Sequence, residues 1–416
     1  MIPVAEARHF VLASCAPLPL RRCAIGDVVG LALAATVCAT QDVPPFANSA
    51  MDGYAVRALD TARAPVRLRV VATLMAGDEP TTPVGSDEAV RIMTGAPMPP
   101  GADSVCMVER TRTETSGSVI VDQAIDPGTN VRHAGEDIAA GAEVFVPGTL
   151  LTPPHIGVLA SLGIETVSVH PRPRVAVVST GDELATASGT LAPGQIRDAN
   201  RPALLAQLRV DGFQVVDLGT VGDDELALAH ILEEGASSCD AVVATGGVSV
   251  GDRDVVRVVL EKLCGQAMRW MQVAVKPAKP FAFGTLASNQ TPVFGLPGNP
   301  VSALVSYELF VRPALRAMAG YRVLDRPRLS ATAETDLGRR RDGKLHLLRV
   351  LAQTGDDGTL RVRLSGGQDS HMLFAMAEAN ALALLPDGDG VAAGGRVDVL
   401  LLDTERLGPG GEEGPW

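Results

Sequence analysis

Cysteines are few in this chain and do not cluster. The six of them are scattered along 416 residues, without a CxxC pair or a histidine-rich neighbourhood. A structural zinc site and a disulfide framework both need closely and regularly spaced cysteines, so neither is predicted. We expect reduced thiols packed in hydrophobic cores, as is usual in the cytosol.

Long hydrophobic runs and an excess of basic residues are also missing. The best candidate for a membrane span, residues 31–39, is far shorter than the roughly 18 to 20 apolar residues that a bilayer requires. Pro17 and Pro19 interrupt the first apolar stretch, which is unlike a cleaved signal peptide. A net charge of -12 argues against a nucleic-acid or anionic-membrane binder. We expect a soluble, cytoplasmic protein that holds any anionic ligand with a few local basic groups.

The chain does contain enough apolar sequence, 46% of its residues, for more than one hydrophobic core. Residues 174–320 alternate short β-rich runs with segments of helical periodicity, which predicts parallel strands joined by right-handed helical crossovers. This pattern predicts a doubly wound, mostly parallel α/β domain, with its ligand crevice beyond the carboxyl ends of the strands. The expected strands are 174–179, 214–218, 240–245, 269–275 and 292–296, and the expected helices are 201–211, 223–235 and 253–263.

The remaining sequence predicts three smaller parts. Residues 42–140 predict a β-rich insertion domain, and helical segments that flank it predict a discontinuous helical linker domain, 1–41 and 141–173. Residues 321–407 predict a small C-terminal β-barrel, and 408–416 predict a disordered tail rich in Gly, Pro and Glu. The expected flanking helices are 4–14, 25–36 and 153–162, the insertion strands are 67–74, 88–94, 104–109 and 119–125, and the barrel strands are 344–352, 360–364, 379–385 and 396–402.

Two glycine-containing motifs follow predicted strands of the α/β domain. In STGDEL (179–184), a tight glycine turn leaves Glu183 beside the crevice, where it could ligate a cation. In TGGVSVGDRD (245–254), the glycines let backbone N–H groups approach a phosphate at the start of the next helix. Asp254 would face that anion through a divalent metal. A plain β–α turn in which Asp254 caps the helix is the alternative.

Two further motifs favour anions. KPAKPFAFG (276–284) places Lys276 and Lys279 on a proline-stiffened loop, a preorganised pair of positive charges suited to a tetrahedral oxyanion or a phosphate. FGLPGNPVS (294–302) turns a strand into a helix whose amino end favours anions. Solvated surface lysines and a purely structural elbow are the alternatives. The polar motifs NSAMDGYAVR (48–57), RIMTGAP (91–97) and RHAGED (132–137) of the insertion domain each predict, taken alone, only a turn.

Taken together, these motifs resemble those of the molybdopterin molybdenumtransferases, a family that includes bacterial MoeA proteins and the E-domains of gephyrin and of its plant counterpart. The likeness rests on PPFANSAMDGYAVR, RIMTGAP, RHAGED, STGDEL, GQIRDAN, TGGVSVGD, KPAKPFAFG and GLPGNPVS, in this order over nearly the whole chain. The resemblance implies an elongated, four-domain homodimer that uses adenylylated molybdopterin, molybdate and Mg²⁺ and releases AMP as molybdenum is inserted. A separate molybdopterin adenylyltransferase and molybdoenzyme chaperones are the implied partners.

Carried over position by position, the resemblance assigns roles to residues of this chain. The implied catalytic residues are Asp52, Thr94, Glu183, Asp223 and Asp254, of which Glu183, Asp223 and Asp254 are the implied metal ligands. The implied substrate-binding residues are Arg132, Gly246, Gly247, Ser249, Lys276, Lys279, Pro297, Pro300, Ser302 and Ser370. No nucleophile is assigned, because positioning and charge neutralisation carry most of the chemistry in transfers at phosphate.

The chain departs from the family pattern at three places. Ala278 stands where the family usually has Gly, and Ala199 where it has a hydroxyl residue. In the C-terminal motif GRxEFxR, Lys344 and His346 stand at the first Arg and the Glu position, and only Arg349 is retained.

Two other functions stay open. A competence-type nucleotide pyrophosphatase carries a related TGG loop on a similar α/β domain, but it would not need the NSAMDGYAV and RIMTGAP segments. A gephyrin-like scaffold could cluster partner proteins without catalysis, although the intact lysine loop favours an enzyme. Molybdate-dependent AMP release would separate both from a molybdenumtransferase.

Overall fold

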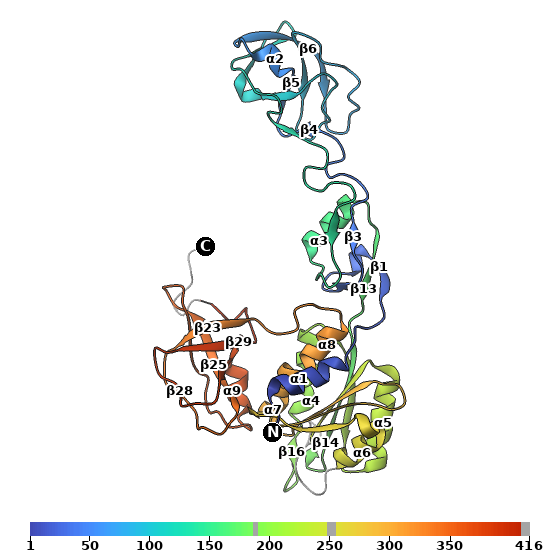
Figure 1. Ribbon diagram of the computed structural model, residues 1–416, viewed down its shortest axis with the longest axis vertical. Coiled ribbons are helices and arrows are strands. Elements are labelled where there is room, and N and C mark those ends of the chain that lie inside the picture. Colours follow the sequence, from blue (N-terminus) through green and yellow to red (C-terminus); the bar gives the residue numbers. More distant parts are fainter. Residues whose placement is uncertain (186–189, 248–254, 409–416) are drawn as a thin grey trace. The chain divides into compact units, whose positions relative to one another are not determined.

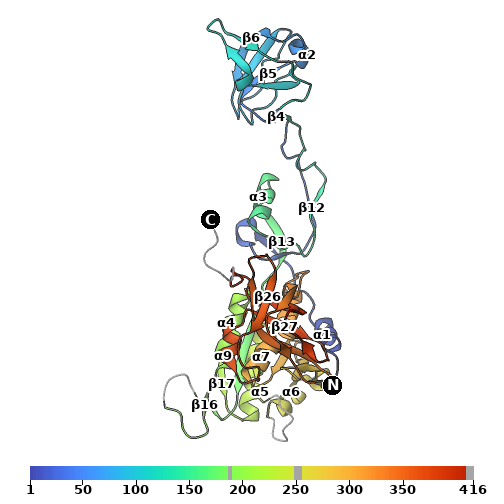
Figure 2. The same ribbon diagram turned by 90° about the vertical axis from the view of Figure 1, so that its left-hand side faces the viewer.

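The structure, a computed structural model, describes residues 1–185, 190–247 and 255–408. The chain forms two compact units: unit 1 is Met1–Arg21 with His170–Trp416, and unit 2 is Arg22–Val169. Figures 1 and 2 show the elements of each unit in two views at right angles. Most of the tail expected at 408–416, together with Ser249 and Asp254, lies outside the described residues.

A six-stranded sheet forms the centre of the α/β part of unit 1, in the order β17-β14-β18-β22-β21-β19. The first four strands run parallel to one another, whereas β21 runs antiparallel to both of its neighbours. The predicted doubly wound, mostly parallel α/β domain is therefore confirmed. The strands are β14 (Arg174–Thr180), β17 (Gln214–Val221), β18 (Ala241–Thr245), β19 (Arg269–Gln272), β21 (Pro280–Thr285) and β22 (Pro292–Leu296).

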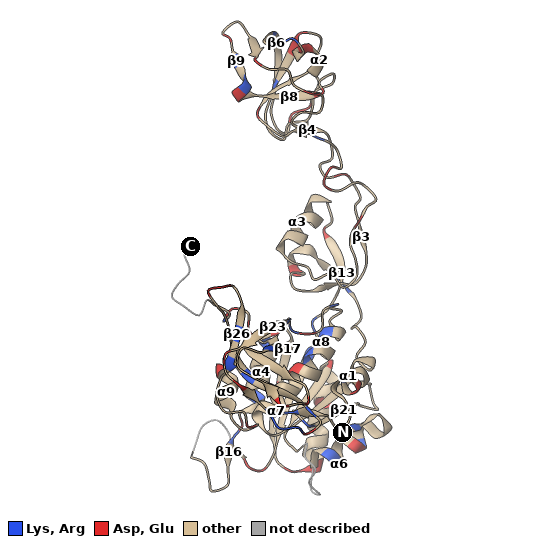
Figure 3. Cartoon of the chain, turned by 60° about the vertical axis from the view of Figure 1, so that its left-hand side comes forward, with Lys and Arg blue, Asp and Glu red and all other residues tan. Residues whose placement is uncertain are grey.

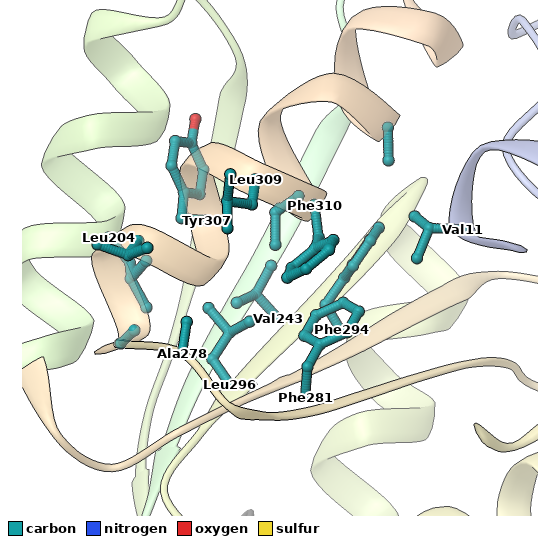
Figure 4. Close-up of a cluster of buried hydrophobic side chains, with 14 of the residues drawn as sticks. Val11, Leu204, Val243, Ala278, Phe281, Phe294, Leu296, Tyr307, Leu309 and Phe310 are labelled. Carbon is teal, nitrogen blue, oxygen red and sulfur yellow. The ribbon is translucent and has the colours of Figure 1, made fainter. Parts of the chain in front are cut away.

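Helices cover both faces of this sheet, because its central strands are apolar on both sides. Val177 of β14 belongs to the core formed with α1, α4, α7 and α8, whereas its neighbour Val178 belongs to the core formed with α5 and α6. In the first core, shown in Figure 4, the rings of Phe281 and Phe310 stack 4.3 Å apart. The helices are α1 (Val4–Ala13), α4 (Asn200–Val210), α5 (Glu225–Ser238), α6 (Val255–Cys264), α7 (Pro300–Ser306), the π-helical η4 (Tyr307–Val311) and α8 (Arg312–Met318).

The segment around the lysines differs from its predicted structure. The run 269–275, predicted as one strand, is divided between β19 and β20 (Val275–Lys276), and β20 joins the C-terminal barrel. The sequence does not predict β21, because its prolines are typical of a loop. Pro280 is the first residue of β21, a position where a missing N–H is tolerated. Phe281 and Phe283 then face the same core, with the two-residue period of a strand.

A barrel of five strands forms the C-terminal part of unit 1, as predicted. The strands follow one another in the order β25-β26-β23-β29-β27, and β27 pairs back onto β25, which closes the ring. β20 pairs with the beginning of β25 and sets Lys276 opposite His346. The barrel contains β23 (Arg328–Ala333), β25 (Leu345–Thr354), β26 (Leu360–Leu364), β27 (Ala381–Leu385) and β29 (Arg396–Leu401), with α9 (Leu373–Glu378) before β27 and the short pair β24 (Leu337–Gly338) and β28 (Gly390–Val391). β23 and α9 are not predicted from the sequence.

The β-rich body of unit 2 is a six-stranded sheet in the order β8-β5-β7-β6-β10-β9. β5 (Gly53–Val56) lies in a motif that predicts only a turn, yet all four of its residues are buried. A Cβ atom at Gly53 would lie 1.9 Å from the carbonyl oxygen of Cys106, so only glycine allows β8 to approach this closely. The other elements are β4 (Asn48–Ser49), α2 (Ala58–Thr61), β6 (Val66–Leu74), β7 (Glu88–Ile92), β8 (Ser104–Met107), β9 (Thr111–Thr113), β10 (Ser118–Val121) and β11 (Val131–Arg132).

The remaining part of unit 2 is less helical than the predicted linker domain. α3 (Pro153–Ser161) forms as predicted, but 25–36, expected as a helix, contains one 3-10 turn, η1 (Ile25–Asp27), and then β2 (Ala32–Leu33). Gly30 has a φ of 79°, which is incompatible with a continuing helix. The helix expected at 4–14 is α1, which packs against α8 within unit 1 (Figure 1) instead of joining α3. The short strands here are β1 (Arg21–Ala24), β3 (Val37–Cys38), β12 (Glu143–Phe145) and β13 (Thr166–His170).

The cysteines are free thiols, as the sequence predicts. All six thiols are free, and Cys15, Cys106, Cys239 and Cys264 are buried, whereas Cys38 is exposed. Burial raises the pKa of Cys15 to about 12 and that of Cys264 to about 11, which keeps both thiols protonated at neutral pH. Among the described helices, none combines the length and apolar character that crossing a bilayer would need.

Candidate functional site

The turns that follow β14, β18 and β22 lie side by side at one edge of the sheet. Ser179 is paired with Thr245, and Thr245 is paired with Leu296, so the three strands end in register. The motifs STGDEL, TGGVSVGD and GLPGNPVS therefore begin at the same edge. This is the edge at which the sequence predicts the crevice of a parallel sheet.

Gly246 is required by the close packing of two of these turns. Its φ is 98°, and an added Cβ atom would lie 2.3 Å from the carbonyl oxygen of Thr180. Gly247 also has a left-handed backbone, with a φ of 62°. The two glycines thus let the backbone after β18 lie directly against the backbone after β14, as a phosphate-binding turn requires.

The side-chain amide of Asn200 connects the end of β18 with the turn after β22. The Asn200 side chain donates from Nδ2 to Thr245 Oγ1 at 2.9 Å and to the carbonyl oxygen of Gly298 at 2.8 Å. Because both hydrogens of the amide are used, its Oδ1 is fixed as an acceptor. Asn200 Oδ1 and Thr180 Oγ1 are buried without a hydrogen-bond partner in the described part of the chain. Asn200 ends the GQIRDAN motif, but the sequence alone assigns it no role.

The two described carboxylates predicted as metal ligands lie on adjacent loops. Glu183 folds back over Gly181, where an added Cβ atom would lie within 2.7 Å of its carboxylate. Asp223 follows β17, and its backbone N–H donates to Asp182 Oδ1 at 2.9 Å. Both side chains are exposed. Within residues 1–185, 190–247 and 255–408, no three His, Cys, Asp or Glu side chains are gathered as a metal site would need.

The lysine loop, residues 276–279, lies at the same edge of the sheet. β21 begins directly after the loop and runs antiparallel to β22, with Ala282 opposite Gly295 near the end of β22. Ala278, in the middle of the loop, is 1% exposed and has a φ of 80°, in the left-handed region that favours glycine. The glycine that the family usually has here suits this backbone, whereas the alanine of this chain is strained in it.

Lys276 and Lys279 are both exposed. Lys276 lines a pocket of about 620 Å³ between the loop and the barrel. Basic and acidic residues are mixed along the rest of unit 1 (Figure 3), so the positive charge of this pocket is local. The other basic or polar residues that line it are Arg339, Arg340, His346, Arg349, Gln368 and Asp369.

The remaining predicted residues of unit 1 connect the crevice with the barrel. Pro297 is buried after β22, and Pro300 is the first residue of α7. Ser302 of α7 is only 5% exposed. Ser370 accepts a hydrogen bond from the Val301 N–H through its backbone carbonyl at 3.1 Å, which ties the barrel to the beginning of α7.

Two of the three predicted residues of unit 2, Asp52 and Thr94, are joined by hydrogen bonds. Asp52 Oδ1 accepts hydrogen bonds from both the backbone N–H and the hydroxyl of Thr94, each at 2.7 Å. These bonds, the backbone one first, lower the pKa of Asp52. Arg132 of β11 is paired with Asn48 of β4, in the segment that leads to Asp52. All three predicted side chains, those of Asp52, Thr94 and Arg132, are exposed at this end of the β-rich body.

Family models match most of the chain. The MoeA N-terminal region (domain I and II) matches residues 2–163, a probable molybdopterin binding domain matches 176–317, and the MoeA C-terminal region (domain IV) matches 334–402. These three models follow one another in the order of the motifs described above.

Proteins of similar sequence and structure bear related names. A Mycobacterium tuberculosis protein named molybdopterin molybdenumtransferase 2 is 40% identical over 379 residues, which cover 89% of this chain and 92% of that protein. A Haemophilus influenzae molybdopterin molybdenumtransferase is 38% identical over 360 residues, which cover 86% of this chain and 88% of that protein. The crystal structure of a molybdopterin biosynthesis moeA protein from Pyrococcus horikoshii OT3 gives a TM-score of 0.82 at 27% identity, covering 96% of this chain and all of that one.

Proposed function

Since the chain belongs to the MoeA family, we propose that it is a molybdopterin molybdenumtransferase, which inserts molybdenum from molybdate into adenylylated molybdopterin and releases AMP, with the cytoplasm as its place of action. The observation that supports this most is the common edge of the sheet. The glycine turn at Gly246 follows β18, the loop of Lys276 precedes β21, and both lie at the same edge of the sheet, with β22 between the two strands. The reaction must bring a phosphate and an oxyanion together. The glycine turn suits the phosphate, and the lysine loop suits the oxyanion.

The residues of the crevice act mainly by positioning their anionic substrates. The turn at Gly246, Gly247 and Ser249 binds the phosphates, while Lys276 and Lys279 neutralise the oxyanion. Pro297, Pro300, Ser302 and Ser370 shape the wall between crevice and barrel. A transferase that neutralises both charges and holds the reactants close needs no nucleophile of its own.

The exposed carboxylates of the crevice fit the Mg²⁺ that the family implies. Hard cations prefer carboxylate oxygens, and Glu183 and Asp223 offer them on loops joined through Asp182. We assign Glu183, Asp223 and Asp254 to the metal, which would screen the repulsion between these carboxylates and the pterin phosphates. Asp52, Thr94 and Arg132 would act from unit 2, with Asp52 ionised at neutral pH.

The proposed assembly is a homodimer. Asp52, Thr94 and Arg132 are exposed in unit 2, whereas the glycine turn and the lysine loop belong to unit 1. A second subunit can bring its crevice to these three residues. We keep 42–140, 174–320 and 321–407 as the proposed domains, and a separate adenylyltransferase and molybdoenzyme chaperones as partners.

The experiment that tests the function is AMP release from adenylylated molybdopterin by the purified chain, with and without molybdate and Mg²⁺. A molybdenumtransferase releases AMP in proportion to molybdate. A pyrophosphatase would release AMP without molybdate, and a scaffold would release none. Either of these two results would refute the proposal.

A further inference from the structure

Another basic pocket lies at the edge of the α/β sheet opposite to the crevice. It has a volume of about 510 Å³, and all of its lining residues belong to unit 1. Arg174 and Gln214 begin the paired parallel strands β14 and β17, and Asp240 directly precedes β18. The crevice lies at the other ends of these strands. The seven residues of β14 therefore separate the two places by about 20 Å.

Positive charge exceeds negative charge in this pocket. Arg21, Arg172 and Arg174 line it, and Asp240 is the acidic residue among the described lining residues. Three arginines against one carboxylate leave a formal excess of two positive charges, in a chain whose net charge is -12. The backbone N–H of Arg174 donates to Asp240 Oδ2 at 2.8 Å, so the main chain already uses one oxygen of this carboxylate. The pocket therefore attracts anions locally.

Two of the three arginines have side chains that can bind an external anion. Other exposed arginines of the chain are held by a carboxylate, as Arg112 is held by Asp122 at 2.6 Å. Within the described ranges, neither the Arg21 guanidinium nor the Arg174 guanidinium forms an ion pair or a hydrogen bond. Both side chains are exposed. A guanidinium presents its N–H donors in a planar fork that matches the oxygens of a phosphate.

The backbone that carries these two arginines is stiff. Pro19 and Pro171 line the pocket, two residues before Arg21 and three residues before Arg174 respectively. His170 Nδ1 lies 2.7 Å from the carbonyl oxygen of Leu18 and donates to it, which joins the two segments. Because proline fixes its φ angle, little conformational entropy is lost when an anion binds here.

The chemistry of the pocket favours a small phosphate ester over a macromolecule. The net charge of -12 opposes long-range attraction of nucleic acids and anionic membranes. Paired N–H donors of arginine bind phosphate at short range, in the geometry that this group requires. The side chains of Gln214 and Ser238 also line the pocket and offer polar contacts to the rest of such a molecule. An acidic protein segment is the alternative that the test decides.

We propose that this pocket binds the phosphate group of a small soluble phosphate ester by Arg21 and Arg174 together. The pocket shares no lining residue with the pocket of Lys276, so the inference does not rest on the proposed transfer of molybdenum. The chain leaves unit 1 after Arg21 and returns to it at His170. A bound phosphate thus joins the outgoing segment of unit 1 to the returning one.

The test locates bound phosphate by chemical protection in the full chain. Phenylglyoxal, which modifies accessible arginine side chains, is applied with and without inorganic phosphate, and mass spectrometry identifies the modified residues. At about ten times the Kd, mass action predicts that modification of Arg21 and Arg174 slows about tenfold. Arg209, exposed in the last turn of α4, is the matched control and should react at an unchanged rate. Potassium chloride of equal ionic strength should not protect either residue.

Two variants test whether Arg21 and Arg174 bind the same phosphate. In Arg174→Gln, the phosphate concentration that half-protects Arg21 should rise about tenfold, because a charged hydrogen bond is lost. In Asp240→Asn, that concentration should fall, because a negative charge leaves the pocket while the amide oxygen can still accept from the Arg174 N–H. A purely structural role of Asp240 predicts weaker protection instead. Arg209→Gln should leave the protection of Arg21 unchanged.

The inference fails if phosphate does not protect Arg21 and Arg174, if chloride protects them equally, or if Arg174→Gln leaves the protection of Arg21 unchanged. Protection by hexaglutamate and not by phosphate would assign the pocket to an acidic protein segment and overturn the inference as well.

Lys276→Ala separates this inference from the proposed function. Protection of Arg21 by phosphate should persist in that variant, whatever its AMP release. Loss of protection in Lys276→Ala would show that phosphate acts from the crevice and would contradict a separate site. Absence of molybdate-dependent AMP release in the wild type refutes the proposed function and leaves the phosphate pocket unaffected.

Discussion

Gly246 is the residue of the crevice that allows the least change. The Gly246→Ala variant must place a Cβ atom 2.3 Å from the Thr180 carbonyl oxygen, on a backbone with a φ of 98°. We expect it to lose about 2 to 4 kcal/mol of unfolding free energy and nearly all AMP release. Gly212→Ala is the matched control, since Gly212 has a φ of 84° but open space around it, and it should lose only about 1 to 2 kcal/mol. Equal losses in denaturant titrations would show that the contact with Thr180 does not matter.

Thr94 controls the ionisation of Asp52. The Thr94→Val variant keeps the backbone N–H donor and removes the hydroxyl, so the pKa of Asp52 should rise toward its ordinary value of 3.8. Because the folded pKa is lowered, the stabilisation is complete above about pH 4 and disappears as the pH falls through the lowered pKa. Asp52 stays ionised at neutral pH in both proteins. An NMR titration of the carboxyl carbon that gave the same pKa in wild type and variant would contradict this account.

Five charged or polar side chains, most of them buried, join α4, η4, α8 and the segment before β23: Asp211, Tyr307, Glu308, Arg312 and Arg326. Asp211 follows α4 and accepts from Tyr307 at 2.7 Å, from Arg312 at 3.2 Å and from Arg326. Asp211→Asn removes one of the two carboxylates that compensate Arg312 and Arg326, the other being Glu308, so we expect a loss of about 3 kcal/mol. Asp398→Asn, which breaks the exposed pair with Arg328, should cost at most about 1 kcal/mol. Chemical denaturation compares the two, and a cost for Asp211→Asn no larger than that for Asp398→Asn would show that the network contributes little.

The elements show which kinds of structure a single sequence can predict. The strands around 174–179 and 292–296 were predictable because continuous apolar runs are typical of strands covered on both faces. β21 was not, since prolines around Lys279 are typical of a loop and only pairing with β22 makes the segment a strand. The apolar period at 25–36 suggested a helix, but Gly30 turns the chain there.

The sequence predicts the motifs of the candidate site but not how most of their residues are arranged in space. Glycine turns after strands must meet at one edge of a parallel sheet, which placed Gly246 and Pro297 correctly beside each other. The role of Asn200 depends on partners distant in the sequence, which no local pattern encodes. The position of Lys276 beside the barrel depends on the pairing of β20 with β25, which the sequence also does not indicate.

At the scale of the whole molecule, we propose that two copies of the chain form the active protein. Asp52, Thr94 and Arg132 belong to unit 2 and the crevice belongs to unit 1, and we expect the crevice of a second subunit to be the one on which they act. Sedimentation velocity at the concentration of the activity assay should give a dimer of about twice the chain mass of 43.2 kDa. A fully active monomer would contradict the proposed assembly.

We propose that molybdenum is transferred at the edge of the sheet that carries both the Gly246 turn and the Lys276 loop. The most direct measurement is the yield of molybdenum-bearing pterin, read by activation of a molybdenum-free molybdoenzyme after incubation with adenylylated molybdopterin, molybdate and Mg²⁺. The wild type and Lys262→Ala, a surface lysine paired with Glu225, should activate it equally, whereas Lys276→Ala should need roughly tenfold more molybdate for the same yield. An unchanged molybdate requirement in Lys276→Ala, or no activation by the wild type, would contradict the account.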